Sequence, residues 1–388
     1  NIALGHKGAE TIMRASKNEH MWYGFLSNYK TQFTDEIKLS GGLDARYYKG
    51  IHYREVTDLL GGQFYVDDAD LNVPEKVVTE GDKINYYNDG LVSWGGGYLT
   101  GEYSTGNLSA FLSGSASIKG YKRVDYFNYF SDEFIDRVKG NDELEQQYLQ
   151  TYDPDDFYTA LEGRETDWQN FFGYVFKGGA NYNITETMNV FLNTGYFERQ
   201  PDFDAVFLNN YNNVNDEAVN EKVFSIEVGY GFQNRYIKAQ ANIYNTLWKD
   251  KTFTFAAESN ATGKVYYANI LGVDALHQGI EFELTARPID KLRIDAMATL
   301  GNWRWNNNVE NTVISDENQN PQDTIDVYVQ DVHVGDAAQT KFFLGASYEL
   351  IPNLKAGVDF YHFDNLFAAF DPLDRSSQEG NDNPDSWK

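Results

Sequence analysis

Several kinds of residue are missing or scarce in this chain, and each absence excludes a class of protein. There is no cysteine among the 388 residues, so neither a disulfide framework nor a thiolate metal site can form. Basic residues are few, because 32 Lys and Arg stand against 58 Asp and Glu and give a formal net charge of −26. Binding to nucleic acid requires Lys and Arg at the phosphates, so no nucleic-acid partner is expected. No segment approaches the roughly 20 apolar residues of a membrane helix.

The chain is rich instead in segments where polar and apolar residues alternate with a period of two, and helical periodicity is nearly absent. In the segment 236–255, "YIKAQANIYNTLWKDKTFTF", one face carries Ile237, Ala239, Ala241 and Ile243, and the other carries Lys238, Gln240 and Asn242. The same alternation recurs in 222–232, 279–287 and 291–305. These patterns predict an all-β protein.

The connections between these segments alternate in length. The short ones are 33–37, 104–107, 183–187, 233–235, 288–291 and 351–353. The long ones are near 56–90, 128–166, 201–219, 257–275, 307–338 and 368–388. Every short turn is followed by a strand, a long loop and another strand, which predicts about twelve antiparallel strands in six hairpins.

This arrangement is typical of an outer-membrane β-barrel, which has short turns at one end, long loops at the other, and strands with one apolar face. The expected strands 36–54, 108–127, 220–235 and 236–256 also exceed the usual 5–6 residues of globular strands. We therefore predict a transmembrane antiparallel β-barrel in which Ile237 and its companions face lipid, whereas Lys238, Gln240 and Asn242 face the lumen. The alternative is a soluble β-sandwich or propeller, but sandwiches mix loop lengths at both ends and propellers repeat every 40–50 residues.

Particular segments also resemble a known family. "MWYGFLSNYK" (21–30), "IKLSGGLDARYYKGIHYREVTDLLGG" (37–62), "LNTGYFERQPDFDAVF" (192–207) and "NEKVFSIEVGYGF" (220–232) are similar to the barrel hairpins of TonB-dependent outer-membrane receptors, particularly those of Bacteroidota. "LHQGIEFELTARPIDKLRIDAMATLGNW" (276–303) continues the resemblance, which covers nearly the whole chain.

The resemblance implies a barrel of 22 strands around a plug, in the outer membrane of a Gram-negative bacterium. Such receptors import scarce nutrients such as metal chelates, oligosaccharides or peptides, with energy supplied through TonB. The chain has no recognisable plug or TonB-binding box, so residues 1–388 are expected to form a partial barrel domain, with the plug and further strands outside it. The implied partners are TonB, acting through those other parts, the lipid bilayer, lipopolysaccharide and a surface lipoprotein.

Two alternatives remain open at this point. The first is a passive pore of twelve strands, in which residues 20–30 would pair with residues 354–366. The second is a receptor-like barrel that serves as a scaffold in a larger outer-membrane complex with surface lipoproteins.

No catalytic or cofactor motif stands out, so an enzyme is not expected. The six histidines are scattered without metal-ligand spacing. In "DDADLN" (67–72), Asp68, Asp70 and Asn72 have the spacing of a calcium loop, but Val73 replaces the glycine of an EF-hand and Thr79 replaces its last glutamate. This leaves a looser loop-bound calcium ion as one interpretation and a solvated acidic loop as the other.

Three tryptophans are candidate ligand contacts. Trp248, Trp303 and Trp305 lie far from their short turns and on the polar side of their strands, which predicts lumen-facing positions near the outer rim. Their rings suit stacking against a sugar or a chelate. Aromatic residues also form the interfacial girdle of such barrels, which is the alternative role.

The acidic segment 128–166 is the longest of the expected loops. Ser131 and Asn141 are placed as helix N-caps, so two short helices are predicted there. Its carboxylates are suited to attract cationic cargo or divalent ions that bridge lipopolysaccharide, and equally to keep an exposed loop soluble.

Overall fold

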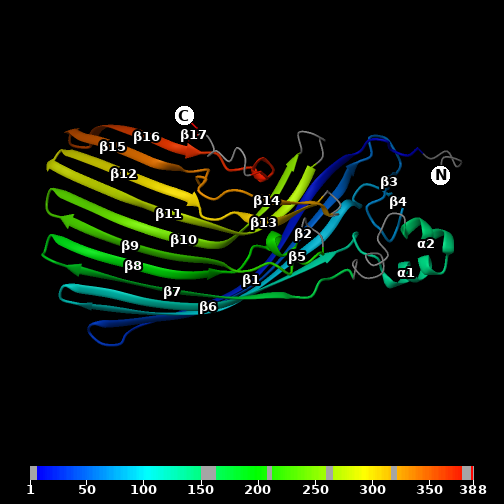
Figure 1. Cartoon of the computed structure of the whole chain (residues 1–388), viewed down its shortest axis with the longest axis horizontal. Coiled ribbons are helices and arrows are strands. Elements are labelled where there is room, and N and C mark those ends of the chain that lie inside the picture. The colour runs from blue at the N-terminus through cyan, green and yellow to red at the C-terminus, as the bar shows by residue number, and fades with distance from the viewer. Residues whose placement is uncertain are drawn as a thin grey trace.

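The main feature of the fold is one continuous antiparallel sheet, seen in a computed structural model that describes residues 7–149, 163–207, 212–258, 265–315, 321–377 and 386–387. Within this part of the chain, twelve long strands follow one another in chain order, and each is hydrogen-bonded to the next (Figure 1). They are β1 (Met13–Gln32), β2 (Ile37–Asp58), β5 (Lys83–Thr105), β6 (Leu108–Asp125), β7 (Gln169–Asn183), β8 (Met188–Arg199), β9 (Glu221–Gln233), β10 (Ile237–Glu258), β11 (Val265–Ile289), β12 (Leu292–Trp305), β15 (Ala338–Ile351) and β16 (Leu354–Phe367). The predicted twelve strands in six hairpins are confirmed.

The two ends of the sheet differ sharply. Tight turns lie at one end, which we call the turn end (left in Figure 1), at residues 33–36, 106–107, 184–187, 234–236, 290–291 and 352–353. The opposite end, called the loop end, carries the smaller elements (Figure 1). These are β3 (Tyr65–Asp67), β4 (Lys76–Val78), α1 (Asp132–Lys139), α2 (Asp142–Leu149), α3 (Phe203–Val206), β13 (Val309–Ser315), β14 (Pro321–Val327), η4 (Leu373–Arg375) and β17 (Ser386–Trp387).

The prediction of a long loop near residues 257–275 was largely wrong. The segment 257–275 is not a long loop, because β10 continues to Glu258 and β11 begins at Val265. The ladder survives two register shifts between Trp248 and Phe253, where Asp250 (φ 57°) and Gly272 (φ 74°) take left-handed conformations. These bulges interrupt the alternation of side chains but not the backbone pairing. The sequence pattern therefore did not reveal this part of β10 and β11, although their backbones remain hydrogen-bonded.

The other predicted loops need smaller corrections. Residues 83–90 belong to β5, so the first loop is narrower than 56–90, and the connection 306–337 contains a hairpin of its own, β13–β14. Several stretches of the predicted loops lie outside the described residues, namely 150–162, 208–211, 259–264, 316–320, 378–385 and 388.

The two predicted helix caps are present. Ser131 Oγ accepts a hydrogen bond from the Phe134 backbone N–H at 3.2 Å, at the start of α1. Asn141 Oδ1 accepts from the backbone N–H groups of Glu143 at 3.2 Å and Leu144 at 3.3 Å, at the start of α2. No helix among the described residues is long and apolar enough to cross a membrane.

A row of exposed apolar side chains crosses five neighbouring strands at one level, and we call it the apolar belt. Its members are Leu192, Val228, Ile243, Ile280 and Leu300, which are paired in that order across β8 to β12. Each is between 42% and 62% exposed. Apolar side chains left open in this way have no protein layer over them, which rules out a sandwich and confirms a wall whose apolar face looks outward to lipid.

The opposite face, called the inner face, is polar and concave. Lys238 and Gln240 line a hollow there together with Glu283 and Asp295. On this face Phe203 of α3 packs beside Gly90 of β5, and α3 also lies against β10. On a flat sheet β5 and β10 would be five interstrand spacings apart, which is about 24 Å. The four-residue helix α3 is only about 6 Å long, so it could not contact both strands of a flat sheet. The sheet therefore curls, with the inner face on the inside.

Clusters of buried apolar residues lie in the loop-end part of the molecule. One cluster contains Ile270, Val273 and Trp305 together with Val327, at the end of β14, and Val329 just after it. Three smaller clusters lie under the connections after β2, β6 and β8. A protein-like core thus forms at the loop end, above the belt.

Both edges of the long sheet are open within the described residues. Residues 21–30 of β1 pair with residues 40–49 of β2, not with residues 354–366. On its far side β16 pairs only through Leu366 and Phe367, with the short β17. The twelve strands do not close on themselves, so the alternative of a passive twelve-strand pore does not describe this structure.

Candidate ligand site on the inner face

A cavity of about 610 Å³ lies on the inner face at the loop end of β1, β2, β5 and β6. Its lining includes Asn18 of β1, Tyr48 and His52 of β2, Asn88 and Val92 of β5, Arg123 and Asp125 of β6, and Phe203 of α3. These residues come from parts of the chain up to 186 positions apart (18 to 204 in the lining) and meet only because the strands pair.

The strand register explains why these side chains share one face. Tyr48 is opposite Val92, and His52 is opposite Asn88. Asn88 in turn is opposite Asp125 on β6. Because successive side chains of a strand alternate between faces, positions two or four apart on each strand all point into the same cavity.

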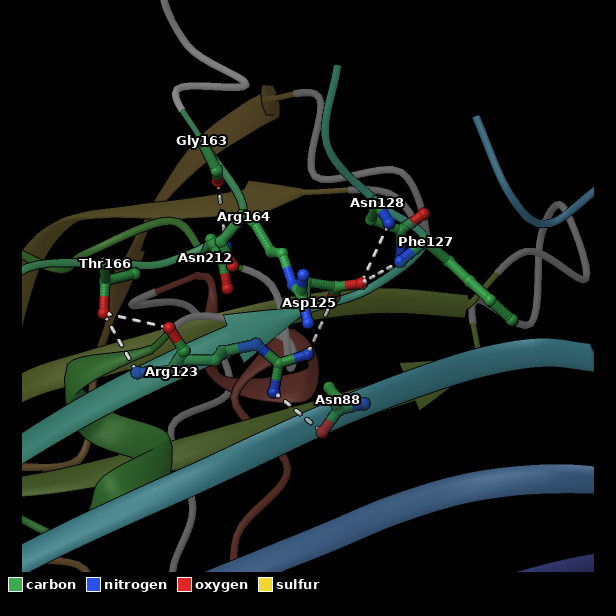
Figure 2. A network of polar contacts seen from close by, with 9 residues as sticks. All are labelled: Asn88, Arg123, Asp125, Phe127, Asn128, Gly163, Arg164, Thr166 and Asn212. Carbon is green, nitrogen blue, oxygen red and sulfur yellow. Dashed lines mark hydrogen bonds and ion pairs between the residues drawn. The ribbon is translucent and has the colours of Figure 1, made fainter. Parts of the chain in front are cut away.

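Arg123 and Asp125, which both line the cavity, form a buried ion pair that we call the floor of the cavity. Figure 2 shows this pair with its hydrogen-bond partners. Arg123 and Asp125 are each 2% exposed, and Arg123 Nη2 lies 3.1 Å from Asp125 Oδ2. Arg123 Nη1 donates a hydrogen bond to Asn88 Oδ1 at 3.3 Å. The two charges offset each other, so the floor is polar but carries no net charge, and a buried pair of this kind serves a defined geometry more than stability.

The same pair anchors the connection that leaves β6. Asp125 Oδ1 accepts hydrogen bonds from the backbone N–H groups of Phe127 at 3.0 Å and Asn128 at 2.8 Å (Figure 2). The Arg123 backbone N–H donates to Thr166 Oγ1 at 2.9 Å, and the Thr166 backbone N–H donates to the Arg123 carbonyl at 3.0 Å. Both ends of the β6–β7 connection are therefore tied to the residues that make the cavity floor.

A second connection, between β8 and β9, joins the first one here. The Arg164 carbonyl accepts hydrogen bonds from the Asp125 backbone N–H at 2.9 Å and from Asn212 Nδ2 at 3.1 Å (Figure 2). Asn212 belongs to the β8–β9 connection, as does Pro201, whose carbonyl accepts from the Tyr121 hydroxyl at 2.6 Å. The β8–β9 connection is thus held over the inner face as a partial cover of the lumen.

A single glycine makes that cover fit closely. A Cβ atom at Gly90 would lie 3.2 Å from the Phe203 ring, which is tighter than most real Cβ contacts. The absence of a side chain at Gly90 therefore lets the Phe203 ring reach the cavity wall.

Aromatic rings extend the cavity along the inner face towards β1. Trp22 pairs with Tyr48 across β1 and β2, and their rings meet edge to face at 5.7 Å. The Tyr48 hydroxyl is 2.6 Å from Nδ1 of His20, which fixes the ring of Tyr48. Trp22 is 63% exposed. Sequence reasoning missed this cavity, although the polar-side positions of Trp22 and Tyr48 were a usable signal.

The tryptophans that the sequence singled out lie elsewhere on the same face. Trp248 and Trp305 both pair with Ala275, and Trp303 pairs with His277. These registers place all three on the inner face of β10 and β12. They do not join the cavity of β1 to β6.

All three tryptophans have structural partners, and Trp248 packs against the buried cluster that contains Trp305. Trp305 is 5% exposed and packs with Phe253 at 5.1 Å and Phe370 at 5.5 Å. Trp303 Nε1 donates a hydrogen bond to the Tyr244 hydroxyl at 2.9 Å. Packing at the loop end accounts for Trp305, and ligand contact by the three rings stays a prediction.

The proposed calcium ligands are already engaged with other groups. Asp68 Oδ1 accepts from the Glu75 backbone N–H at 3.0 Å, Asp70 Oδ2 lies 3.2 Å from Lys76 Nζ, and Asn72 Oδ1 accepts from the Ser131 backbone N–H at 2.8 Å. In the part of the chain that the structure describes, no group of three or more His, Asp and Glu residues is placed to hold a metal ion. A calcium ion at this loop stays a prediction.

Comparison with known proteins identifies the family. The family "TonB dependent receptor-like, beta-barrel" matches residues 7–386. The chain belongs to this family. Receptor barrels of this family lie in the outer membrane of Gram-negative bacteria.

Solved structures agree on the fold. The copper transporter OprC matches with a TM-score of 0.57 and 13% identity, over 90% of this chain and 44% of that one. The siderophore receptor PiuA from Acinetobacter baumannii matches with a TM-score of 0.54 and 13% identity, over 91% of this chain and 47% of that one. The ferric-catecholate import receptor Fiu from K12 E. coli has a TM-score of 0.50 and 11% identity, over 90% and 45% of the two chains.

At such identities the likeness concerns the fold alone. The chain spans less than half the length of each of these three structures. A search of curated proteins finds no match.

Proposed function

We propose that this chain forms part of the wall of an outer-membrane receptor that imports a scarce nutrient with energy supplied through TonB. The observation that carries the proposal is the apolar belt on the outside of a curled sheet whose polar inner face holds a partly covered cavity at the loop end. Such a wall suits a ligand that arrives from the loop side and is held in the lumen. The function is transport and not catalysis.

The open edges of β1 and β16 support a larger barrel. A strand edge in lipid leaves unpaired N–H and C=O groups, and each costs several kcal/mol, so the edges require neighbouring strands. We infer a barrel of 22 strands, of the type found in Bacteroidota, with a plug inside that TonB remodels.

The proposed partners are those that membership of the family implies. The apolar belt contacts the bilayer, and the loop end lies at the level of lipopolysaccharide. TonB acts through the plug, and a surface lipoprotein would cover the loop end where the cargo is a glycan or a peptide.

A growth experiment tests this proposal. A receptor-deletion strain and its parent are compared on panels of limiting iron, carbon and cofactor sources, and the nutrient that depends on the receptor is then supplied to a strain without TonB. We expect uptake to be lost in both mutants. Uptake that persists without TonB would indicate a passive pore, whereas a deletion that affects no nutrient but disperses a surface complex would indicate a scaffold.

A further inference from the structure

We infer that the cavity on β1, β2, β5 and β6 binds a neutral, hydroxyl-rich ligand, a short segment of an oligosaccharide, in preference to a charged metal chelate. The inference deepens the proposed import function and takes its biological meaning from it. Three features of the cavity support it, namely its charge, an amide that is held in place by Arg123, and its aromatic side chains.

The charge of the lining does not favour an anionic chelate. Arg123 is offset by Asp125 at 3.1 Å, and the remaining charged residue of the lining is Asp204, an exposed carboxylate. An anion entering the cavity would meet no net positive charge. The other polar groups are neutral amides, two tyrosines and a histidine, which both donate and accept hydrogen bonds as sugar hydroxyls do.

Asn88 is a specific recognition element. Its side chain lies in the cavity lining and the residue is 9% exposed. Its Oδ1 accepts from Arg123 Nη1 at 3.3 Å, and this contact orients the amide. Among the described residues its Nδ2 has no hydrogen-bond partner. A ligand hydroxyl that accepts from Nδ2 would gain from a donor already held in place by the contact with Arg123, because little side-chain freedom is lost on binding.

The aromatic walls provide the apolar half of the recognition. Tyr48 and Phe203 both line the cavity, and Phe203 lies against Gly90. The exposed Trp22 ring adjoins Tyr48 just beyond the lining and extends the aromatic surface towards β1. Sugar rings have C–H faces that pack on aromatic rings, while their hydroxyl edges reach the amides. The volume of about 610 Å³ falls in the range of about 300–1,000 Å³ that is usual for small-molecule sites.

Binding to the purified full-length receptor in detergent tests the inference. The probes are a panel of neutral gluco-, manno- and xylo-oligosaccharides, a ferric tris-catecholate complex and a mixture of short peptides, followed by calorimetry. We expect saturable binding of at least one neutral oligosaccharide. Asn88→Leu should weaken that binding about fivefold, the effect of one hydrogen bond. Phe203→Ala should weaken it about tenfold through the lost ring contact.

Matched controls keep the test decisive. Asn193→Leu changes another inner-face amide, which donates to Glu227 at 3.4 Å outside the cavity, and should leave binding unchanged. Trp22→Leu alters an exposed ring, so it tests the aromatic wall even if the buried Asn88 variant fails to fold. Heat-dependent gel mobility reports folding of every variant.

Two results would overturn the inference. The first is that no neutral oligosaccharide binds, or that the ferric complex or a peptide binds with the same sensitivity to the cavity variants. The second is that the affinity for the oligosaccharide is unchanged in all three variants, at Asn88, Phe203 and Trp22. Failure of energised import is a separate result. If the purified receptor binds the sugar but uptake does not depend on TonB, the proposed function is refuted and this inference is not.

Discussion

An arginine in place of Ile243 would put a charge in the middle of the apolar belt. Ile243 is exposed, and its cross-strand neighbours Val228 and Ile280 are apolar and exposed as well. In a soluble β-protein an exposed position of this kind accepts arginine with little effect. In a lipid-facing wall the guanidinium must either enter hydrocarbon or bend away towards water.

The position in the strand sets the size of the effect. Ile243 is six residues beyond the start of β10 at Ile237. At about 3.3 Å per residue and a tilt of about 40°, it lies about 15 Å above the turn end, near the middle of an apolar band about 25 Å tall. Arginine at the midplane of such a barrel costs about 2–4 kcal/mol. The neighbours offer no polar group, so the cost should fall in the upper part of that range.

The control is Gln240→Arg on the inner face of the same strand. Gln240 pairs with Glu283 and Gly231, so the new charge meets a carboxylate and water, and the change should stay within about 0.5 kcal/mol. Both variants are measured in the full-length receptor by reversible denaturation in lipid vesicles, followed by tryptophan fluorescence. If Gln240→Arg destabilises as much as Ile243→Arg, or more, the assignment of faces is refuted.

Three further perturbations have defined outcomes. Arg123→Met should lower the free energy of unfolding by about 3–5 kcal/mol, because it leaves the buried carboxylate of Asp125 without its ion-pair partner. Arg46→Met, which breaks a more exposed ion pair with Asp44, should lower it by under about 1 kcal/mol in the same denaturation assay. Ser131→Ala should remove about 1 kcal/mol from α1, seen as faster hydrogen exchange in 132–139 and not in the strands. Burial, with a smaller contribution from Arg304, lowers the pKa of His333, so its neutral form is favoured in the folded state. The stability it contributes is present above the usual pKa of about 6.5 and is lost as pH falls through the lower folded value. Exchange in 321–337 should therefore rise between pH 7 and pH 5, and His333→Phe should abolish that rise.

Local patterns explain why so much of the fold could be predicted. The alternation of Ile237 to Ile243 with Lys238 to Asn242 needs only the two-residue repeat of a strand, and it fixed both the strand and its outward face. The N-caps at Ser131 and Asn141 depend on a side chain and the backbone two or three residues away. Interactions over so short a range are readable without a tertiary structure.

The errors arose where backbone pairing acts independently of side-chain pattern. Residues 265–275 are mostly apolar and lack a regular alternation of polar and apolar positions, yet they continue a ladder with β10 past its bulges. The pattern of β12 indicated the face on which Trp305 lies. It could not indicate that the β13–β14 hairpin packs around Trp305 and buries it.

The strands, the end of the sheet at which each connection lies and the face that meets lipid depend on neighbours within a few residues, so they could be predicted before the fold was known. The cavity that Asn18, Asn88, Arg123 and Phe203 share could be found only in the folded chain. Their meeting depends on which strands pair, in which register, and on the curl that carries α3 across the inner face. Those choices are made by hydrogen bonds and packing between residues far apart in the chain, and no local pattern records them.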